Sequence, residues 1–443
     1  MIRKPDATRP TTVRYRVLVL LALAALINYF HRFPMSVASD SIQSDLGLTL
    51  KQMGWLMGPA FGIPYAVSQL LTGWVGYRWG TRRAFSLYAA IWSSFVGLMS
   101  LAGGFFSFAV LRVGQGLAQS GFLPCTVNTV SQWFPFRRRG VAAGVVGCSM
   151  AVGAALAAYV TGKLLTVIGW RWVFALYFFP GILWAVWFFS WFRDRPQEHG
   201  STNEEECELI RGQLTSAETE RDGRRPVPWA AMASLPAMWA LSAQQFLRGL
   251  GFYFFVSWFP RYLKETQGVT DTGELGAYAS APLILDMLGR LVGGAVSDWV
   301  LTHTGRRWLA RSGLASLTLL GCALGSFCAY YVDGAFAVTA VLSAGAFLGA
   351  MSSPCSHAVS MDIGLRYTAI VFAVMNAVGS LDAFSPWIVA YLVDDLGVAW
   401  KSIPFFFVAV YVAAALSWAL LNPNRTLDAS PERGDRSVNG EPQ

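Results

Sequence analysis

Apolar segments of about twenty residues recur along almost the whole chain, and this recurrence limits the fold more than any other feature. The hydrocarbon core of a bilayer is about 30 Å thick, so a helix needs roughly 20 apolar residues to cross it. Twelve segments meet this requirement, near residues 17–38, 53–76, 84–104, 106–129, 140–162, 171–192, 237–262, 276–301, 310–331, 335–357, 367–392 and 401–421. The sequence therefore predicts an all-α membrane protein with twelve transmembrane helices.

The composition excludes a set of water-soluble domains. Charged residues make up 14% of the chain and hydrophobic residues 54%, whereas soluble domains carry about 25% charged residues. The basic N-terminus followed by an apolar run resembles a signal peptide. However, the run from Val17 to Ala38 is long enough to span, carries His31 and Arg32 near its far end, and lacks a convincing small-residue cleavage site. We therefore expect an uncleaved first helix.

One long polar stretch divides the spans into two groups of six. The predicted organisation is an N-terminal six-helix bundle (1–192), a cytoplasmic linker loop (193–235), a C-terminal six-helix bundle (236–421) and a disordered cytoplasmic tail (422–443). The segment Gly73–Arg83 is also echoed by Gly294–Arg307, about half a chain later. Such an offset is typical of a duplicated six-helix unit.

The placement of positive charge predicts the orientation. The net charge is +8, and its arginines fall in short clusters in alternate loops, as the positive-inside rule requires of cytoplasmic loops. We therefore expect a bacterial-type inner-membrane protein with both termini in the cytoplasm and with the lipid bilayer, not nucleic acid, as its partner. The sequence contains no Walker motif, no HExxH or GxSxG motif and no paired cysteines at metal-ligand spacing. We expect no enzyme activity, cofactor or metal site.

Two loop segments of the chain resemble the signature G-x-x-x-D-R-x-G-R-R of the major facilitator superfamily. The second copy keeps Gly294, Asp298, Gly305, Arg306 and Arg307, and the first keeps Gly73, Arg78, Gly80, Arg82 and Arg83. Tyr77 replaces the acid of the first copy. The resemblance implies two bundles that alternate access to a central site, usually as a monomer. It also implies a conformational latch, formed here by Gly73, Arg78, Arg82, Arg83, Asp298, Arg306 and Arg307.

Further patterns resemble the anion:cation symporters within that superfamily: "NYFHR" in the first span, "RVGQGLAQSGFLP" in the fourth, "GWRWVF", and N-x-x-G from Asn376 to Gly379. This resemblance implies import of a small organic anion, such as a sugar acid or an aromatic carboxylate, coupled to a proton or sodium ion. The sequence departs from the family where His31 and Gln119 replace its coupling acids, so coupling stays open. Organophosphate exchange, metabolite or drug efflux and ligand sensing remain alternatives, although the fifth span lacks the Gly-Pro pair of exporters.

Polar side chains inside the spans are the candidates for the transport site, because such residues usually face a cavity or a partner. The candidates for substrate binding are Tyr29, Arg32, Tyr65, Arg112, Gln119 and Asn376, and those for coupling are His31 and Asp382. Arg32 offers a planar fork of donors that matches a carboxylate, although it could instead snorkel to the outer interface. Arg112 could be a second anion contact or an architectural partner. Asp286 and Arg290, one turn apart, predict an ion pair, and Arg248 could face the cavity.

Overall fold

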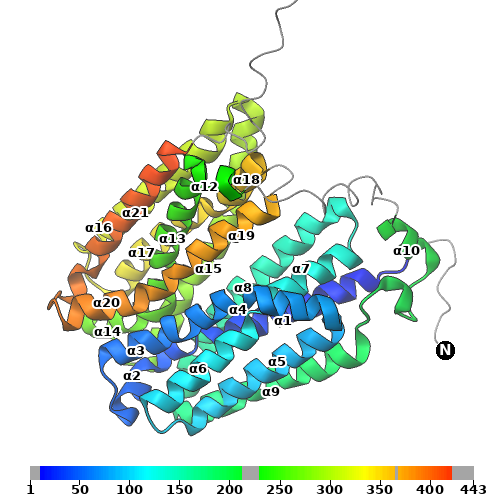
Figure 1. The fold of residues 1–443 in the computed structure, drawn as a ribbon. Coiled ribbons are helices and arrows are strands. Elements are labelled where there is room, and N and C mark those ends of the chain that lie inside the picture. Colours follow the sequence, from blue (N-terminus) through cyan, green and yellow to red (C-terminus); the bar gives the residue numbers. More distant parts are fainter. Residues whose placement is uncertain (1–9, 212–228, 365–367, 422–443) are drawn as a thin grey trace, which may run out of the picture.

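The computed structural model describes residues 10–211, 229–364 and 368–421, and these residues are almost entirely helical (Figure 1). The first half of the chain forms one bundle along the first six predicted spans. Its helices are α1 (Val13–Arg32) with α2 (Met35–Leu46), α3 (Leu50–Met57) with α4 (Pro59–Trp79), α5 (Thr81–Leu98), α6 (Phe105–Gln119) with α7 (Phe122–Trp133), α8 (Phe136–Leu165) and α9 (Trp170–Trp191).

The second half forms a matching bundle. Its helices are α13 (Pro236–Ser257) with α14 (Phe259–Gln267), α15 (Thr272–Thr304), a π-helical turn (Leu309–Gly313) with α16 (Leu314–Cys328), α17 (Ala335–Met351) with α18 (Ser353–Gly364), α19 (Thr368–Gly379) with the 3-10 segment η5 (Ser380–Phe384) and α20 (Ser385–Asp394), and α21 (Ile403–Leu420). Two short helices, α10 (Glu204–Arg211) and α12 (Trp229–Ser234), lie between the bundles in sequence. The predicted tail lies outside the described residues.

The membrane character and the two-bundle fold predicted from the sequence are confirmed. Eight helical spans within the described residues are long and apolar enough to cross a bilayer by length and composition alone. The other four predicted spans correspond to α3–α4, α6–α7, α13–α14 and α19–α20, each of which is interrupted within its length.

The first span is longer than predicted, and this changes the position of Arg32. The prediction ended this span at residue 38, whereas the helical segment runs from Val13 to Leu46 with a short break at Phe33 and Pro34. The polar residues of α2 hid this continuation. Ser36 and Ser39 are buried and donate hydrogen bonds to main-chain carbonyls three residues earlier. Arg32 therefore lies near the middle of the span, which removes the alternative of snorkelling at its outer end.

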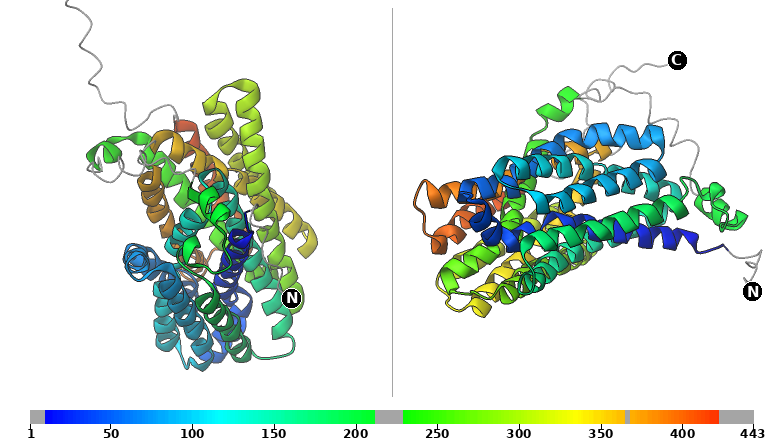
Figure 2. Two further views of the ribbon diagram at one scale, coloured as in Figure 1. Left: turned by 90° about the vertical axis from the view of Figure 1, so that its right-hand side faces the viewer. Right: turned by 90° about the horizontal axis from the view of Figure 1, so that it is seen from below.

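The two bundles meet at one end and separate at the other (Figures 1 and 2). We call the end that carries Asp40, Asp45, Asp333, Asp394 and Asp395 the acidic face, and the end that carries Arg82, Arg83, Arg138, Arg306 and Arg307 the basic face. Ion pairs cross between the bundles at the acidic face: Lys51 with Asp395 at 2.9 Å, Arg261 with Asp40 at 3.3 Å, and Lys264 with Asp40. Within the described part of the chain, no ion pair joins the bundles at the basic face.

Glycines of the first bundle allow the backbones of the two bundles to touch beside η5. A Cβ atom on Gly58 would lie 2.0 Å from the carbonyl oxygen of Ala383, and one on Gly62 would lie 2.2 Å from the Cβ of Ala383. Gly54 approaches the carbonyl oxygen of Pro386 in the same way, with a Cβ distance of 2.6 Å. We call these contacts of Gly54, Gly58 and Gly62 with Ala383 and Pro386 the glycine contact.

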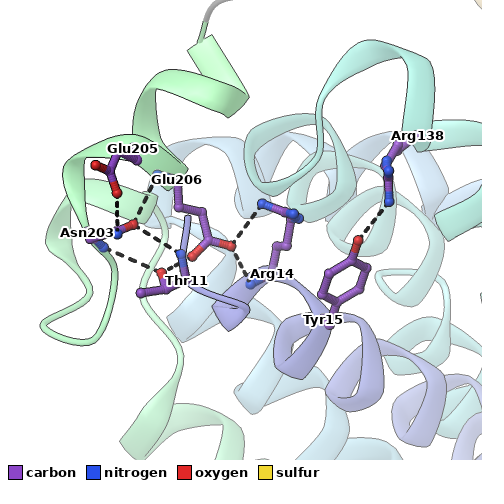
Figure 3. A network of polar contacts seen from close by, with 7 residues as sticks. All are labelled: Thr11, Arg14, Tyr15, Arg138, Asn203, Glu205 and Glu206. Carbon is purple, nitrogen blue, oxygen red and sulfur yellow. Dashed lines mark hydrogen bonds and ion pairs between the residues drawn. The ribbon is translucent and has the colours of Figure 1, made fainter. Parts of the chain in front are cut away.

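At the basic face, the short helix α10 is attached to the beginning of α1 (Figure 3). The side chain of Asn203 caps α10 by accepting a hydrogen bond from the amide of Glu206 at 3.1 Å. The carboxylate of Glu206 is fully buried; it accepts hydrogen bonds from the hydroxyl of Thr11 and from the amide and guanidinium of Arg14. The linker is therefore anchored to the first bundle by a buried ion pair.

Replacing Glu206 by glutamine should lower the thermal stability of the detergent-purified protein, because Arg14 would lose its carboxylate partner while remaining 8% exposed. Removing one partner of a buried pair costs roughly 3–5 kcal/mol. Glu208→Gln is the matched control, since Glu208 lies exposed on the same helix. Equal melting temperatures for the two variants would contradict the anchoring role of Glu206.

Candidate functional site

A cavity of about 270 Å³ lies between the two bundles near their middle. A second cavity, of about 560 Å³, adjoins it between α8 and α15 and shares several lining residues, among them Tyr29, Arg290 and His357. The α8 residues that line the second cavity fall between Ala143 and Ala154, in the first two-thirds of this helix, which begins at the basic face. At the other end of α8, Gly162 packs directly on Gly276. The central cavity therefore opens toward the basic face.

Arg32 enters the central cavity at the break that separates α1 from α2. Its guanidinium donates a hydrogen bond to the hydroxyl of Tyr253, on α13 of the other bundle, at 2.8 Å. It also lies 4.4 Å from the ring centre of Phe61 and 5.0 Å from that of Tyr65. Aromatic faces stabilise a guanidinium without neutralising it. Among the described residues, no carboxylate lies within 4.0 Å of Arg32, so its donors can meet an incoming anion.

Two more arginines line the cavity from the second bundle. Arg248, on α13, is 8% exposed and donates a weak hydrogen bond to Gln245 at 3.4 Å. Arg290, on α15, forms an ion pair with Asp286 at 2.7 Å, which confirms the predicted intrahelical pair, and donates to the hydroxyl of Ser353 at 3.2 Å. Asp286 lines only the adjoining cavity.

The balance of charge in the central cavity favours an anion. Its charged lining side chains are Arg32, Arg248, Arg290 and Asp382, three positive against one negative. In a cleft with low-dielectric walls, an excess of one sign concentrates ligands of the opposite sign. Neutral hydrogen-bonding groups complete the lining: Tyr29, Tyr65, Gln245, Tyr253, Ser353, His357, Asn376 and Ser380. The site can therefore pair a carboxylate with guanidinium groups and hydrogen-bond the hydroxyls of a small polar molecule.

The structure brings five of the predicted site residues together in this cavity: Tyr29, Arg32, Tyr65, Asn376 and Asp382. They come from α1, α4, α19 and η5, which are far apart in the sequence but converge between the bundles. Tyr253 was not predicted, because it is one of several aromatic residues in "FYFFVSWF" and no pattern distinguishes it from its neighbours.

Arg112 does not line the central cavity; it lies behind Arg32. Each of its three guanidinium nitrogens donates within the first bundle: the Leu56 and Met57 carbonyls accept at 2.9 and 3.3 Å, and the Gln115 side chain accepts at 2.7 Å. These carbonyls belong to the last turn of α3, where the helix ends and cannot satisfy them itself. The structure thus favours the architectural alternative for Arg112, as a clamp on the break between α3 and α4.

Gln119 and His31 also lie away from the cavity, inside the first bundle. Gln119 is fully buried and donates to the carbonyl oxygen of Asn28 at 3.3 Å. His31 is 1% exposed and packs beside Gly181 of α9 and Ser93 of α5. Successive residues of a helix point about 100° apart, which is why Arg32 enters the cavity while its neighbour His31 does not. These positions disfavour substrate contact for Gln119 and coupling through His31.

Within the described residues, no hydrogen bond or ion pair joins the predicted latch to the opposite bundle in this conformation. The amide of Arg82 donates to the carboxylate of Asp194 at 2.9 Å, and its guanidinium donates to the carbonyl of Phe189 at 2.7 Å. Asp298 pairs with Arg311 at 3.2 Å within the second bundle. Gly73 packs on Pro124, and Arg78 lies over the ring of Trp74. The remaining latch arginines are exposed: Arg83, Arg306 and Arg307. A latch between bundles therefore stays a prediction for another conformation.

Asp194 provides an acid beside the first-bundle loop, where Tyr77 replaces the acid of the signature. Gly80 adopts φ +82°, a conformation that favours glycine, and a Cβ there would lie 2.5 Å from the Asp194 carboxylate. The sequence places Asp194 directly after the sixth span, far from the signature, so its approach to Gly80 and Arg82 was not predictable from motif spacing.

Comparison with known proteins agrees with this geometry. The family model described as "Major Facilitator Superfamily" matches residues 21–384. The chain belongs to this superfamily. Its members are transporters, not enzymes, and the bundles described above are their fold.

Within the superfamily, the chain is of the anion:cation symporter type. It is 30% identical over 434 residues to the "Probable galactarate/D-glucarate transporter GudP" of Bacillus subtilis, covering 94% of this chain and 93% of that protein. It is 28% identical over 424 residues to the "Probable sulfoacetate transporter SauU" of Cupriavidus necator, covering 95% and 96%.

Solved structures confirm the fold. The inward-open xylose transporter XylE from E. coli superposes with a TM-score of 0.72 at 14% identity, covering 94% of this chain and 98% of the transporter. The inward-facing, unoccupied bacterial homologue of the human lysosomal transporter Spinster gives a TM-score of 0.71 at 18% identity, covering 93% and 95%.

Proposed function

We propose that this transporter imports a small organic anion, a carboxylate such as a sugar acid or an aromatic acid, with the movement of a cation. The observation that carries the proposal is the unneutralised guanidinium of Arg32 in a cavity where three arginines face one carboxylate. The names of the relatives support it, because they describe transporters of sulfoacetate, galactarate and D-glucarate, all of which are anions.

In the proposed cycle, the two bundles rock about the glycine contact, and the site opens to one side at a time. We propose bundles of residues 1–192 and 236–421, joined by the linker 193–235, and a working unit that is a monomer. We also propose that the basic face is cytoplasmic, with both termini on that side of a bacterial inner membrane, because arginine-rich loops are retained inside. The latch residues Arg78, Arg82, Arg83, Asp298, Arg306 and Arg307 would then engage when the basic face closes.

Ligand-induced thermal stabilisation of the purified protein tests the substrate class. Sulfoacetate, D-glucarate, D-galactonate and D-glucuronate are compared with D-xylose and D-galactose, which are neutral. An anion present at 100 times its dissociation constant should stabilise the folded state by about 2.7 kcal/mol, whereas the neutral sugars should have no effect. Uptake of the stabilising anion into proteoliposomes then establishes transport. Stabilisation by the neutral sugars alone would overturn the proposal.

A further inference from the structure

Asp382 is the acidic side chain among the described residues that line the central cavity. It lies in η5, where the eleventh span leaves α-helical geometry between α19 and α20. Its carboxylate fits against the backbone of α13 so closely that a Cβ atom on Gly249 would come within 2.0 Å of one carboxylate oxygen. Within the described residues, it has no ion-pair partner within 4.0 Å. Asp382 is half-buried, and at membrane depth a carboxylate without such a partner is costly to keep ionised.

The groups around Asp382 come from both bundles, and Arg290 of α15 and His357 of α18 line the same cavity. Arg32 of α1 and Arg248 of α13 are close enough for electrostatic interaction, and Tyr253 of α13 is a third neighbour. The backbone amide of Ala383 also interacts with this carboxylate. Tyr65 of α4 and Asn376 of α19 line the same cavity. The positive groups that would bind a substrate carboxylate thus also interact with the carboxylate of Asp382.

We propose, on the basis of the anion-transport function above, that Asp382 is the proton-binding residue that couples transport to a proton gradient. When Asp382 is ionised, its charge occupies the field of Arg32 and Arg248 and repels an incoming anion. When a proton neutralises it, both guanidinium groups are free to bind the substrate. Proton and anion therefore bind with positive cooperativity, and by linkage each raises the affinity for the other.

The location of Asp382 also connects its protonation to the motion of the bundles. The next residue, Ala383, makes the glycine contact with Gly58 and Gly62 of the first bundle. Closing the cavity around an anion while Asp382 is still ionised would bury one more charge than closing it around an anion and a proton, and such a charge costs several kcal/mol. The site that holds an anion without a proton would therefore close less readily than the site that holds both.

Proteoliposome assays with the four anionic probes named above separate exchange from proton-driven accumulation. We expect wild-type protein to exchange a probe across the membrane and to accumulate it under an inwardly directed proton gradient. In Asp382→Asn the ratio of accumulation to exchange should fall at least tenfold, because accumulation requires net proton movement and counterflow does not. The control is Asp333→Asn, an exposed acid paired with Lys401 at the acidic face, which should behave as wild type.

The pH dependence of probe binding provides a second measurement. In wild-type protein the affinity should fall as pH rises through the pKa of Asp382, by up to about tenfold per pH unit for one linked proton. Asp382→Asn should flatten this profile. If this variant does not fold, Gly249→Ala displaces the carboxylate without removing it and should weaken the same dependence.

Accumulation by Asp382→Asn under a proton gradient at the wild-type level would overturn the assignment. Wild-type accumulation that follows a sodium gradient and ignores pH would overturn it as well. If wild-type protein exchanges none of the four probes, the anion-transport proposal itself fails, and the inference fails with it.

Discussion

Replacing Arg32 by glutamine should weaken the binding of a carboxylate substrate by about thirtyfold or more and abolish uptake. The variant keeps a polar side chain but removes the charge and the fork of donors. Truncating one partner of a buried, hydrogen-bonded charge pair costs about 2–5 kcal/mol, and every 1.4 kcal/mol is about tenfold in affinity. The dissociation constants of the two proteins, measured by titration of the stabilising anion, test this.

Arg32→Lys separates charge from geometry at the same position. Lysine keeps the positive charge but cannot form two parallel hydrogen bonds to one carboxylate, so its affinity should lie between those of the wild type and the glutamine variant. Arg171→Gln is the matched control, because Arg171 is a half-exposed arginine that pairs with Asp45 at the acidic face. The melting temperature without ligand controls for folding. Unchanged affinity in Arg32→Gln would contradict the assigned site.

The twelve spans and the two-bundle fold were predictable because helix length in a bilayer is set by hydrophobic thickness. The breaks within the spans were not. The break after Gly58 depends on contacts of α3 with α20 and on the clamp by Arg112, and η5 packs against α4. Such contacts join residues that lie tens to hundreds of positions apart in the sequence, and a local hydrophobic pattern contains no information about them.

The candidate site was predictable in its types of residue but not in its orientation. A single sequence shows that His31 and Arg32 are both polar residues at membrane depth, but not which of the two neighbours faces the cavity. Only the packing of α1 against α5 and α9 turns His31 inward, beside Ser93 and Gly181. Gln119 and Arg112 are hidden for the same reason, since both face neighbouring helices of their own bundle.

Gly62→Ala should shift the transporter away from the conformation described here and slow transport. The added methyl group would lie 2.2 Å from the Cβ of Ala383, whereas carbon atoms pack at about 3.5–4.0 Å. The backbones of α4 and η5 must therefore move apart, which weakens the contact that holds the acidic face closed. Overpacking of this kind costs about 1–3 kcal/mol, and this conformation should become about 5- to 140-fold less populated relative to its alternatives.

A native cysteine can report this shift. Cys148 lines the cavity between α8 and α15 and is half-buried, whereas Cys125, Cys322 and Cys355 are buried. The rate at which a water-soluble maleimide modifies Cys148, read by peptide mass spectrometry, should fall in Gly62→Ala, because the conformation with this cavity becomes less populated. The control is Gly294→Ala, where the added methyl group would lie at an ordinary 3.7 Å from Pro354. Unchanged modification of Cys148 would contradict the glycine contact as a determinant of this conformation.

Uptake by Gly62→Ala distinguishes a changed equilibrium from a damaged site. Alternating access needs both conformations to be populated in every cycle, so a shift of about 1–3 kcal/mol in either direction slows net flux. The substrate contacts at Arg32 lie outside the glycine contact and should survive the substitution. The variant should therefore still be stabilised by the anion while transporting it slowly, the reverse of Arg32→Gln, which should lose stabilisation first. Loss of both in Gly62→Ala would show that the glycine contact shapes the binding cavity itself and does not act only as a pivot.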